Sequence, residues 1–330
     1  MIASPETLEV DSPITTASAP KGVEANPPDA ADENLYLNGR PTMKDFIRYV
    51  RSHAVHPPGE GMLVEEWQAA NDVVRAIEKE EAGCADHPPI IKIEVNSKYE
   101  PLLIEFLKDP LIRHGFNTVP TEVAMVELDR LVVYQKNIDL AFVRQLKNKL
   151  GPTPSDEEIF RTCLPYDHPQ PPVTWSRVHH NKFVFMSPSN DLRFLGTMRL
   201  QASNIKDYAP PGNLVGVVGI AVGFGSNFLN AVCAENRIIL NNGSHRAYAL
   251  RDMGFTHVPC IVQHVASREQ LDVVACTDIR EAPDFYLKHP RPSMLKDYFN
   301  PKLRKVMPVR RRLHQVTVQF EVDDFSVPAV

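Results

Sequence analysis

A histidine and an arginine stand side by side, behind a glycine, in the segment Asn242-Gly243-Ser244-His245-Arg246. Arginine presents a planar, permanently charged fork that suits phosphate or carboxylate, whereas histidine titrates near neutral pH and can donate or accept a proton. Glycine carries no Cβ, so the backbone at this position can come close to a ligand. The segment predicts a phosphate site in which Arg246 counters the charge of the ligand and His245 assists.

The residues around this segment predict the elements that would position it. The hydrophobic pattern indicates a strand at 237–240, a helix at 244–253 and a second strand at 258–262. Free amide groups at a helix start, with the positive end of the helix dipole behind them, form a ready site for an anion. The alternative is a plain loop-to-helix turn, in which the glycine serves geometry and the charged side chains face solvent.

The turn and its surroundings resemble the ParB/sulfiredoxin superfamily. That superfamily has a small α/β fold with a Gly-x-His-Arg turn, or a related Gly-Glu-Arg-Arg turn, followed by a helix and a strand that begins near a Gly…Val-Pro pattern. In this chain Gly254 and then a Val-Pro pair follow the turn, and residues 123–135 are similar to the first strand and loop of the superfamily. Residues 137–146 are similar to its first helix. The resemblance covers 121–265 and implies an α/β (α+β) core with a small mixed sheet.

The branches of this superfamily use the turn differently. Sulfiredoxins carry a cysteine where this chain has Ser244, and ParB partition proteins bind CTP through the Glu-Arg-Arg version and carry a helix-turn-helix domain, which is not evident here. Free-serine kinases keep the His-Arg pair and are nearest in local residue chemistry. The resemblance therefore implies a nucleotide- and phosphate-binding protein, specifically an ATP- or ADP-dependent phosphotransferase acting on a small-molecule substrate, with Mg²⁺ held mainly by the nucleotide.

The predicted nucleotide-binding residues are those of the turn itself, Asn242, Gly243, Ser244, His245 and Arg246, with His245 also catalytic. A phosphotransferase further needs a carboxylate that activates the acceptor hydroxyl. Glu127 and Asp129 belong to the predicted first strand, where strand alternation puts both on one face. These two residues are the predicted catalytic carboxylates. No spacing typical of a metal site accompanies them.

A second class of function also fits the sequence. The segment from Lys288 to His314 contains nine Lys or Arg against one acid, Asp297, although the whole chain has a net charge of −5. Such a basic arm favours contact with DNA or an acidic partner, or else is a solvated surface. The alternative prediction is therefore a non-catalytic, nucleotide-gated clamp, or a protein that binds DNA or a partner through this arm.

Composition sets the frame for both hypotheses. The 330 residues are enough for two ordinary domains, and 43% hydrophobic with 23% charged residues is typical of a globular protein. No apolar run is long enough to span a bilayer, and the N-terminus lacks the pattern of a secretory signal. Five scattered cysteines do not form a disulfide or zinc-ribbon framework. The chain is predicted to be cytoplasmic, without a membrane partner.

Changes in composition divide the chain into four regions. Residues 1–40, rich in Pro, Ala, Ser and acids, are predicted to be disordered, and 41–120 to be mainly helical, beginning with a helix that Thr42 can cap. The superfamily-like core at 121–265 contains a proline-rich insertion at 151–182, which is predicted to lack regular helix or central strand and to form a surface loop or lid. Residues 266–330 are predicted to form a helix, the basic arm and a final strand.

Two shorter patterns lie in the sequence before the Gly243 turn. Residues 228–233 are predicted to pair with 237–240 in a hairpin that delivers the turn to a sheet edge. After a predicted strand at 183–186, Ser189, Asp191 and Arg193 form a polar cluster. This cluster is either the edge of a polar pocket or a hydrogen-bonded turn.

Overall fold

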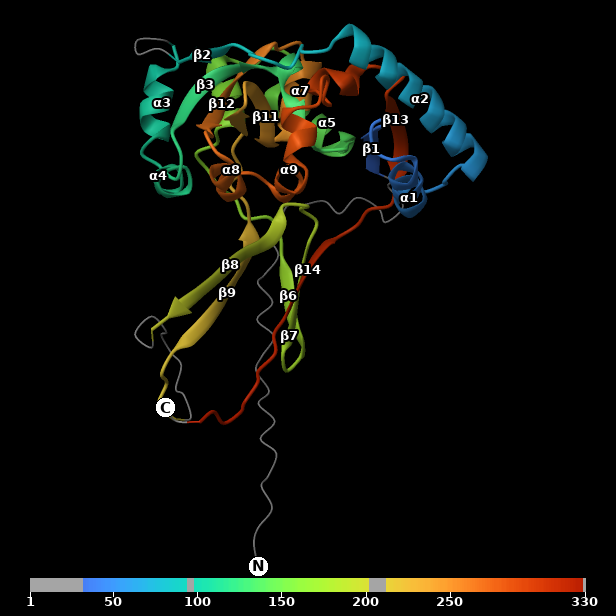
Figure 1. Cartoon of the computed structure of the whole chain (residues 1–330). Helices are drawn as coiled ribbons and strands as arrows, with labels where there is room; N and C mark the ends of the chain where they lie inside the picture. The colour runs from blue at the N-terminus through green and yellow to red at the C-terminus, as the bar shows by residue number, and fades with distance from the viewer. Residues whose placement is uncertain (1–31, 94–97, 202–211, 329–330) are drawn as a thin grey trace, which may run out of the picture. The chain divides into compact units, whose positions relative to one another are not determined.

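The structure, a computed structural model, describes residues 32–93, 98–201 and 212–328 (Figure 1). Within these residues it contains ten helices and fourteen strands in four sheets, with 35% helix and 29% strand. The predicted mixed α/β class is confirmed. No helix in the described part of the chain is long and apolar enough to cross a membrane.

The main sheet has six strands in the order β2-β3-β12-β10-β11-β4. Their bounds are Ile90–Lys92 for β2, Thr121–Glu127 for β3, His257–His264 for β12, Asn230–Ala234 for β10, Arg237–Asn242 for β11 and Val132–Val133 for β4. β12 runs parallel to β10 and antiparallel to β3. The sheet is mixed, as predicted for the core.

The hairpin of β10 and β11 forms as predicted from the sequence. Ala234 pairs with Arg237, so the turn consists of Glu235 and Asn236, and both have positive φ, 46° and 70°. Two consecutive positive φ values are typical of a type I′ turn, whose twist matches that of the strands it joins. β11 consequently carries the chain along the sheet towards Gly243.

Helix α7 (Ser244–Asp252) connects β11 to β12, with Gly254 at φ +93° after its end. It packs against α5 (Leu140–Leu150), whose first turn is capped by the Asp139 carboxylate. The predicted strand-helix-strand unit is confirmed. The predicted helix at 137–146 begins later than expected, because Asn137–Asp139 forms the short strand β5.

A second sheet joins three distant segments in the order β13-β1-β5. β1 (Asp32–Leu37) lies between β5 and β13 (Arg304–Val309), and its residues Leu35 and Tyr36 are buried. The prediction of disorder up to residue 40 is therefore wrong for β1, because pairing with residues almost 270 positions away orders a segment that has little propensity by itself. Residues 1–31 lie outside the described part.

The region at 41–120 is mainly helical. It contains α1 (Met43–His53), α2 (Glu60–Glu80), α3 (Glu100–Phe106) and α4 (Pro110–Gly115), besides β2. Thr42 caps α1 by accepting a hydrogen bond from the amide of Asp45, as its position before an apolar stripe predicted. Phe46 and Val50 of α1 pack with Leu63 of α2.

The proline-rich insertion contains regular structure, contrary to prediction. α6 (Asp156–Cys163) begins with a capping box between Ser155 and Glu158, and Phe160 and Cys163 are fully buried. The prolines precede and follow this helix, so they limit its length without preventing it. β6 (Thr174–His179) follows and pairs with β7 (Lys182–Ser187).

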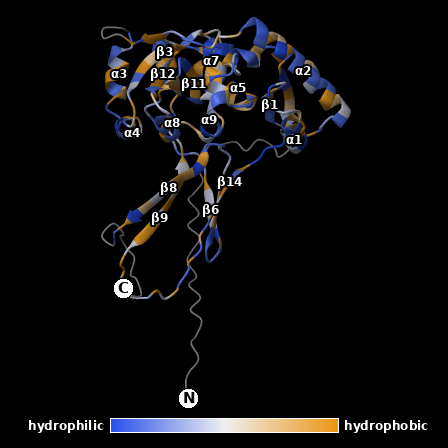
Figure 2. Ribbon diagram, in the orientation of Figure 1, coloured by the Kyte–Doolittle hydropathy of each residue, from blue (hydrophilic) through white to orange (hydrophobic). Residues whose placement is uncertain are grey.

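Two smaller sheets complete the described strands. β14 (His314–Gln319), β7 and β6 form a three-stranded sheet, and β8 (Leu192–Leu200) pairs with β9 (Val217–Phe224) in a two-stranded ribbon. β9 is coloured almost throughout as hydrophobic (Figure 2). Helices α8 (Arg268–Val274), α9 (Thr277–Glu281) and α10 (Pro283–Leu287) lie between β12 and the C-terminal strands in sequence.

Candidate functional site

The Gly243 turn has the backbone geometry that only glycine adopts easily. Its φ is +97°, and a Cβ at this position would lie 2.5 Å from Cδ1 of Leu229. Ser244, the first helical residue, is buried. The turn therefore packs closely on the segment before β10, and glycine is needed there for the fold itself.

Arg246 lies inside the protein. Its side chain is buried, and Nη1 donates hydrogen bonds to the carbonyl oxygens of Thr162, Cys163 and Asn227 at 3.2, 3.3 and 2.7 Å. Burial lowers the pKa of its guanidinium. Nη1 of Arg246 thus holds the end of α6 and the approach to β10 against α7, a structural role that the predicted phosphate site did not include.

His245 is partly buried beside α5. Its ring meets that of Phe142 edge-on, with centroids 5.6 Å apart. Burial lowers the pKa of the imidazole, and the nearby Asp139 carboxylate acts weakly in the opposite direction. His245 thus points to the α5 side of α7, and Arg246 points to the α6 side.

The predicted catalytic carboxylates lie at the other end of α7. Glu127 pairs with His257 at the start of β12, and Asp129 forms an ion pair of 2.9 Å with Arg251 in the last turn of the helix. Nine helical residues span about 13 Å, so the structure does not bring these carboxylates to Gly243. Their assignment to the turn is corrected. The predicted shared face is also wrong, because β3 ends at Glu127 and Asp129 lies in the 3-10 helix Leu128–Arg130.

A polar cavity of about 260 Å³ lies beside Asn242, just before the Gly243 turn. Four carboxamide side chains line it, together with one arginine, one serine, one threonine and one cysteine, and small or apolar residues from the ends of α4 and α8. The polar lining residues are Asn230, Asn241, Asn242, Gln263, Arg193, Ser226, Thr118 and Cys276. We call this cavity the carboxamide pocket.

One of these carboxamides has a buried hydrogen-bonding atom without a partner. Asn230 is 4% exposed, and its Oδ1 has no hydrogen-bond partner among the described residues. Gln263 is 3% exposed on the neighbouring strand, and Asn242 donates from Nδ2 to the carbonyl of Ser226 at 2.6 Å. A buried polar atom without a partner costs free energy, so a ligand that supplies the missing hydrogen bond would be favoured.

Two further polar groups of the pocket, Asn241 and Arg193, are paired within the protein. Asn241 donates to the carbonyl of Val274 at 3.0 Å and accepts from the amide of Cys276 at 2.8 Å, which ties β11 to the end of α8. Arg193 forms an ion pair with Asp191, so the polar cluster near residue 190 makes both a turn and one edge of the pocket. The pocket therefore presents hydrogen-bonding groups with little net charge.

A larger hollow of about 530 Å³ lies elsewhere, between the end of α5 and Met253. Lys147, which lines it, is engaged in an ion pair with Asp252. No unpartnered buried polar atom is recorded at this hollow among the described residues. The carboxamide pocket is therefore the better candidate, although it is the smaller of the two.

The basic segment near the C-terminus is not a free arm. Arg291 is buried in an ion pair with Asp297, Lys305 binds Glu66 at 2.6 Å, and residues 304–309 of the segment form β13. Residues 310–312 are exposed, and Arg311 pairs with Asp32 at 3.3 Å. Four of the nine basic residues, Arg291, Lys296, Lys305 and Arg311, thus pair with acids in or next to α2 and β1.

Comparison of the chain with models of known protein families, with curated proteins and with solved structures finds no match. The resemblance to the ParB/sulfiredoxin superfamily stays a prediction. Sequence reasoning found Asn242 and Arg193 but missed Asn230 and Gln263. In the structure Asn230 lies opposite Asn242 through a register shift between Asn230 and Ala231, which the predicted hairpin, ending at residue 240, did not include.

Proposed function

We propose that the protein binds a nucleotide in the carboxamide pocket and does no phosphoryl transfer there. The observation that carries this proposal is the unpartnered Oδ1 of the buried Asn230, beside the equally buried Gln263. A carboxamide offers one acceptor and two donor hydrogens in one plane, which is the pattern that pairs with the edge of an adenine base.

The size and charge of the pocket support a base rather than a triphosphate as its occupant. Its volume of about 260 Å³ is somewhat below the ~300–1,000 Å³ of usual ligand sites. Arg193, the charged residue among the described lining residues, already pairs with Asp191. A neutral, planar, hydrogen-bonding group therefore fits better than a highly charged one.

The non-catalytic alternative is favoured over the phosphotransferase. Nη1 of Arg246 donates to three backbone carbonyls. Glu127 and Asp129 lie by the C-terminal end of α7, away from Gly243. Phosphoryl transfer needs cations and a base that converge on one phosphate. The residues predicted for these roles point to different sides of the helix.

The test is a thermal-shift series with adenosine, ADP, ATP, CTP and GTP, with and without Mg²⁺. A ligand that binds the folded state raises the apparent stability. We expect adenine compounds to raise the melting temperature of the wild type, with adenosine retaining most of the effect. Asn230→Leu and Gln263→Leu should abolish the shift.

The same variants carry an internal control for folding. Replacing an unpaired buried carboxamide by an apolar group of similar shape is close to neutral, so Asn230→Leu should fold and melt near the wild-type temperature without ligand. Asn148→Leu removes an exposed carboxamide on α5 and should leave the ligand shift intact. A shift of equal size in wild type, Asn230→Leu and Gln263→Leu would refute the proposal, as would the lack of any shift in the wild type.

A further inference from the structure

Arg193 lies at the outer end of the carboxamide pocket. Its side chain is 49% exposed, and Ser226 of the same pocket lining is also exposed, whereas Asn230 and Gln263 are 4% and 3% exposed. The pocket therefore has an inner end at these two carboxamides and an outer end that opens to solvent. We call Arg193 and Ser226 the outer pair.

The guanidinium of Arg193 keeps donors free. Nε donates to the carbonyl oxygen of Asp191 at 3.3 Å, and Nη2 donates to the carboxylate of the same residue. A guanidinium carries five N–H donors, of which these contacts use two. No partner of the other three donors is recorded within residues 32–93, 98–201 and 212–328. These donors are available to a ligand in the pocket.

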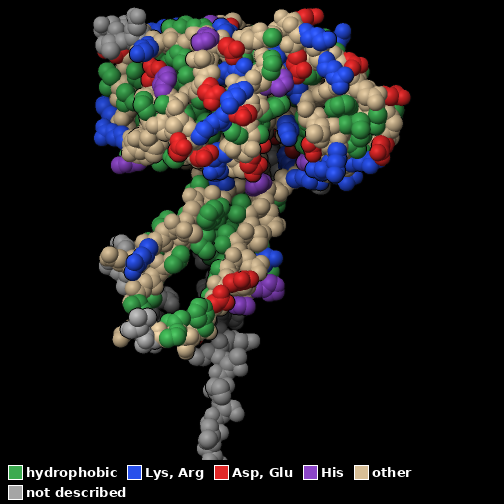
Figure 3. All heavy atoms as spheres, in the orientation of Figure 1, with side chains coloured by type: hydrophobic (Ala, Val, Ile, Leu, Met, Phe, Trp, Pro, Cys, Tyr) green, Lys and Arg blue, Asp and Glu red, His purple; other side chains and the backbone are tan. Residues whose placement is uncertain are grey.

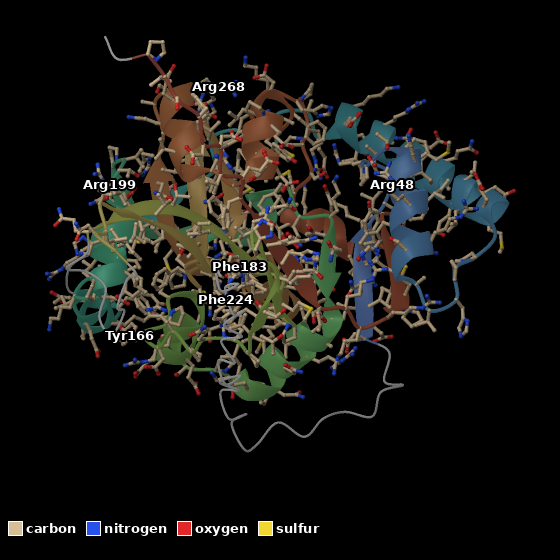
Figure 4. The ribbon with its side chains drawn as sticks, turned by 90° about the horizontal axis from the view of Figure 1, so that it is seen from below. Arg48, Tyr166, Phe183, Arg199, Phe224 and Arg268 are labelled. Atoms are coloured by element: carbon tan, nitrogen blue, oxygen red, sulfur yellow. The ribbon has the colours of Figure 1, made fainter. Side chains whose placement is uncertain are left out.

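Gly225 fixes the position of this guanidinium. A Cβ at Gly225 would lie 2.3 Å from Nη2 and 2.5 Å from Cζ of Arg193, so the guanidinium packs directly on the backbone of the glycine. The pairing of Arg193 with Gly223 brings the start of β8 beside the end of β9. Figure 4 labels Phe224, the last residue of β9, directly before Gly225. The ribbon thus holds a half-exposed arginine at the pocket.

The loop that follows Gly225 offers further hydrogen-bond donors. Asn242 holds Ser226 from one side, because its Nδ2 donates to the Ser226 carbonyl at 2.6 Å. Among the described residues, no partner is recorded for the Ser226 hydroxyl or for the backbone amides of residues 225–228. Phosphate oxygens accept hydrogen bonds from arginine, from serine hydroxyls and from backbone amides. The outer end consequently combines one charge with neutral donors, which is the chemistry that a phosphate group needs.

We propose that the ligand of the carboxamide pocket is a nucleoside monophosphate, with its base at Asn230 and Gln263 and its phosphate at the outer pair. The proposal rests on the nucleotide binding proposed above, because the bound base determines where the phosphate lies. A base and its phosphate are the two ends of one nucleotide. The pocket has hydrogen-bonding atoms without a recorded partner at both of its ends, and the charge lies at the outer one.

The charge at the outer end suits one phosphate better than three. A phosphate monoester carries about −1.5 to −2 charges at pH 7, and Arg193 is the charged residue among the described lining residues. Asp191 already offsets part of its charge. Acidic and basic side chains are interspersed on the main body seen above the β8–β9 ribbon, so a longer phosphate chain would meet charges of both signs (Figure 3). A triphosphate therefore gains little over a monophosphate.

The experiment compares the dissociation constants of adenosine, AMP, ADP and ATP for the full-length protein, measured by isothermal titration calorimetry at low salt, with and without Mg²⁺. We expect AMP to bind ~5-fold more tightly than adenosine, because an exposed ion pair adds about this much to an affinity. ADP and ATP should bind within ~3-fold of AMP, since no further cation meets their additional phosphates. Arg193→Gln should bring AMP to the affinity of adenosine and change the affinity for adenosine by less than ~2-fold.

Asp191→Asn tests the same charge in the opposite direction. Asp191 competes with a phosphate for the Arg193 guanidinium, and asparagine keeps the size of the side chain without its charge. The variant should therefore bind AMP more tightly than the wild type does, by ~2- to 3-fold, with adenosine unchanged.

Gly225→Ala separates the position of the guanidinium from its charge. The added methyl group collides with Cζ and Nη2 of Arg193, so the guanidinium must move while the net charge stays the same. This variant should lose the preference for AMP, as Arg193→Gln does. Arg199→Gln is the matched control: Arg199, also labelled in Figure 4, is an exposed charge farther along β8 and outside the pocket lining, so the preference should persist.

Three results would overturn the proposal. If AMP and adenosine bind equally well to the wild type, or if Arg193→Gln keeps the preference for AMP, the phosphate does not lie at Arg193, although nucleotide binding itself stands. ATP binding more than ~10-fold tighter than AMP would show that the site is built for a longer phosphate chain. If none of the four compounds binds, the proposed function fails as well. Thermal unfolding of each variant without ligand shows whether a loss of binding comes with a loss of the fold.

Discussion

The contacts of a helical side chain in this protein depend on its position around the helix axis. His245 and Arg246 are adjacent in sequence and looked like one site, yet they lie about 100° apart around α7 and reach different neighbours. His245 meets Phe142, and Arg246 meets the carbonyls that end α6. Adjacent residues on a helix do not face each other, so the pair does not act on one ligand.

Arg246→Met is expected to destabilise the fold rather than change ligand affinity. The substitution leaves the carbonyls of Thr162, Cys163 and Asn227 without their donor, which should cost about 2–4 kcal/mol in the free energy of unfolding. Urea denaturation measures the loss. Arg251→Met on the same helix removes a partly exposed ion pair and should cost less than ~1 kcal/mol. Equal losses would contradict the structural role of Arg246.

His245→Gln should reduce the pH dependence of stability. Burial lowers the pKa of His245 in the folded protein, so at mildly acidic pH the unfolded chain binds a proton that the folded chain does not. Stability is therefore highest above the ordinary histidine pKa of about 6.5 and is lost as pH falls below it. Denaturation of wild type and variant at several pH values between about 5 and 7.5 tests this. Parallel curves would show that His245 titrates normally.

At the scale of elements, two constraints require glycine at the turn between β11 and α7: the backbone angle φ and the space left by neighbouring atoms. Gly243 needs a positive φ and also lies against Leu229, whereas Gly254 needs a positive φ at an open position. These two glycines bracket the same helix. A comparison of alanine substitutions at these two positions separates the cost of the backbone conformation from the cost of steric crowding.

Gly243→Ala should therefore destabilise the protein more than Gly254→Ala. At Gly254 an added methyl group meets nothing within 4 Å, so the cost is that of a left-handed residue, about 1 kcal/mol. At Gly243 the same methyl also collides with Leu229, which should bring the total to about 3 kcal/mol. Thermal or urea unfolding of the two variants compares them directly. A similar loss in both would mean that Leu229 moves aside freely.

At the scale of the whole molecule, a buried charge network joins segments that are far apart in the chain. Asp297 accepts from both Nη atoms of Arg291, at 3.0 and 2.5 Å, and Arg291 also reaches Glu81 at 2.9 Å. Arg40 lies 3.9 Å from the same carboxylate and binds Glu78. The network fastens the C-terminal part of the chain to α2 and to the segment after β1.

Asp297→Ala should be among the most damaging substitutions in this chain. It leaves Arg291, which is 1% exposed, and the buried Arg40 without their shared counter-charge, at an expected cost of about 3–5 kcal/mol. Asp284→Ala removes a solvent-exposed partner of Arg268 and serves as the control, with little expected change. Measuring the free energy of unfolding of both variants tests this prediction. A small effect at Asp297 would show that water replaces the lost carboxylate.

Local patterns in the sequence were sufficient to predict the elements that depend on residues close together in the chain. The β10–β11 hairpin, the helix from Ser244, the strand around Val258–Val262 and the Thr42 cap all depend on residues within a few positions of one another. The mixed α/β class follows from these elements. Such signals act through backbone propensity and capping, which a short window contains.

Tertiary structure decided which residues form the site. β1 became a strand because it lies between β13 and β5. Asn230, Gln263 and Arg193 became neighbours because the starts of β10 and β8 and the end of β12 meet at the carboxamide pocket. β3 ends at Glu127 beside the start of β12, and Asp129 pairs with Arg251, so both carboxylates lie by the end of α7 that is far from Gly243. The hydrophobic pattern determines which face of an element is buried, but long-range pairing determines which elements meet, and a site is made where they meet.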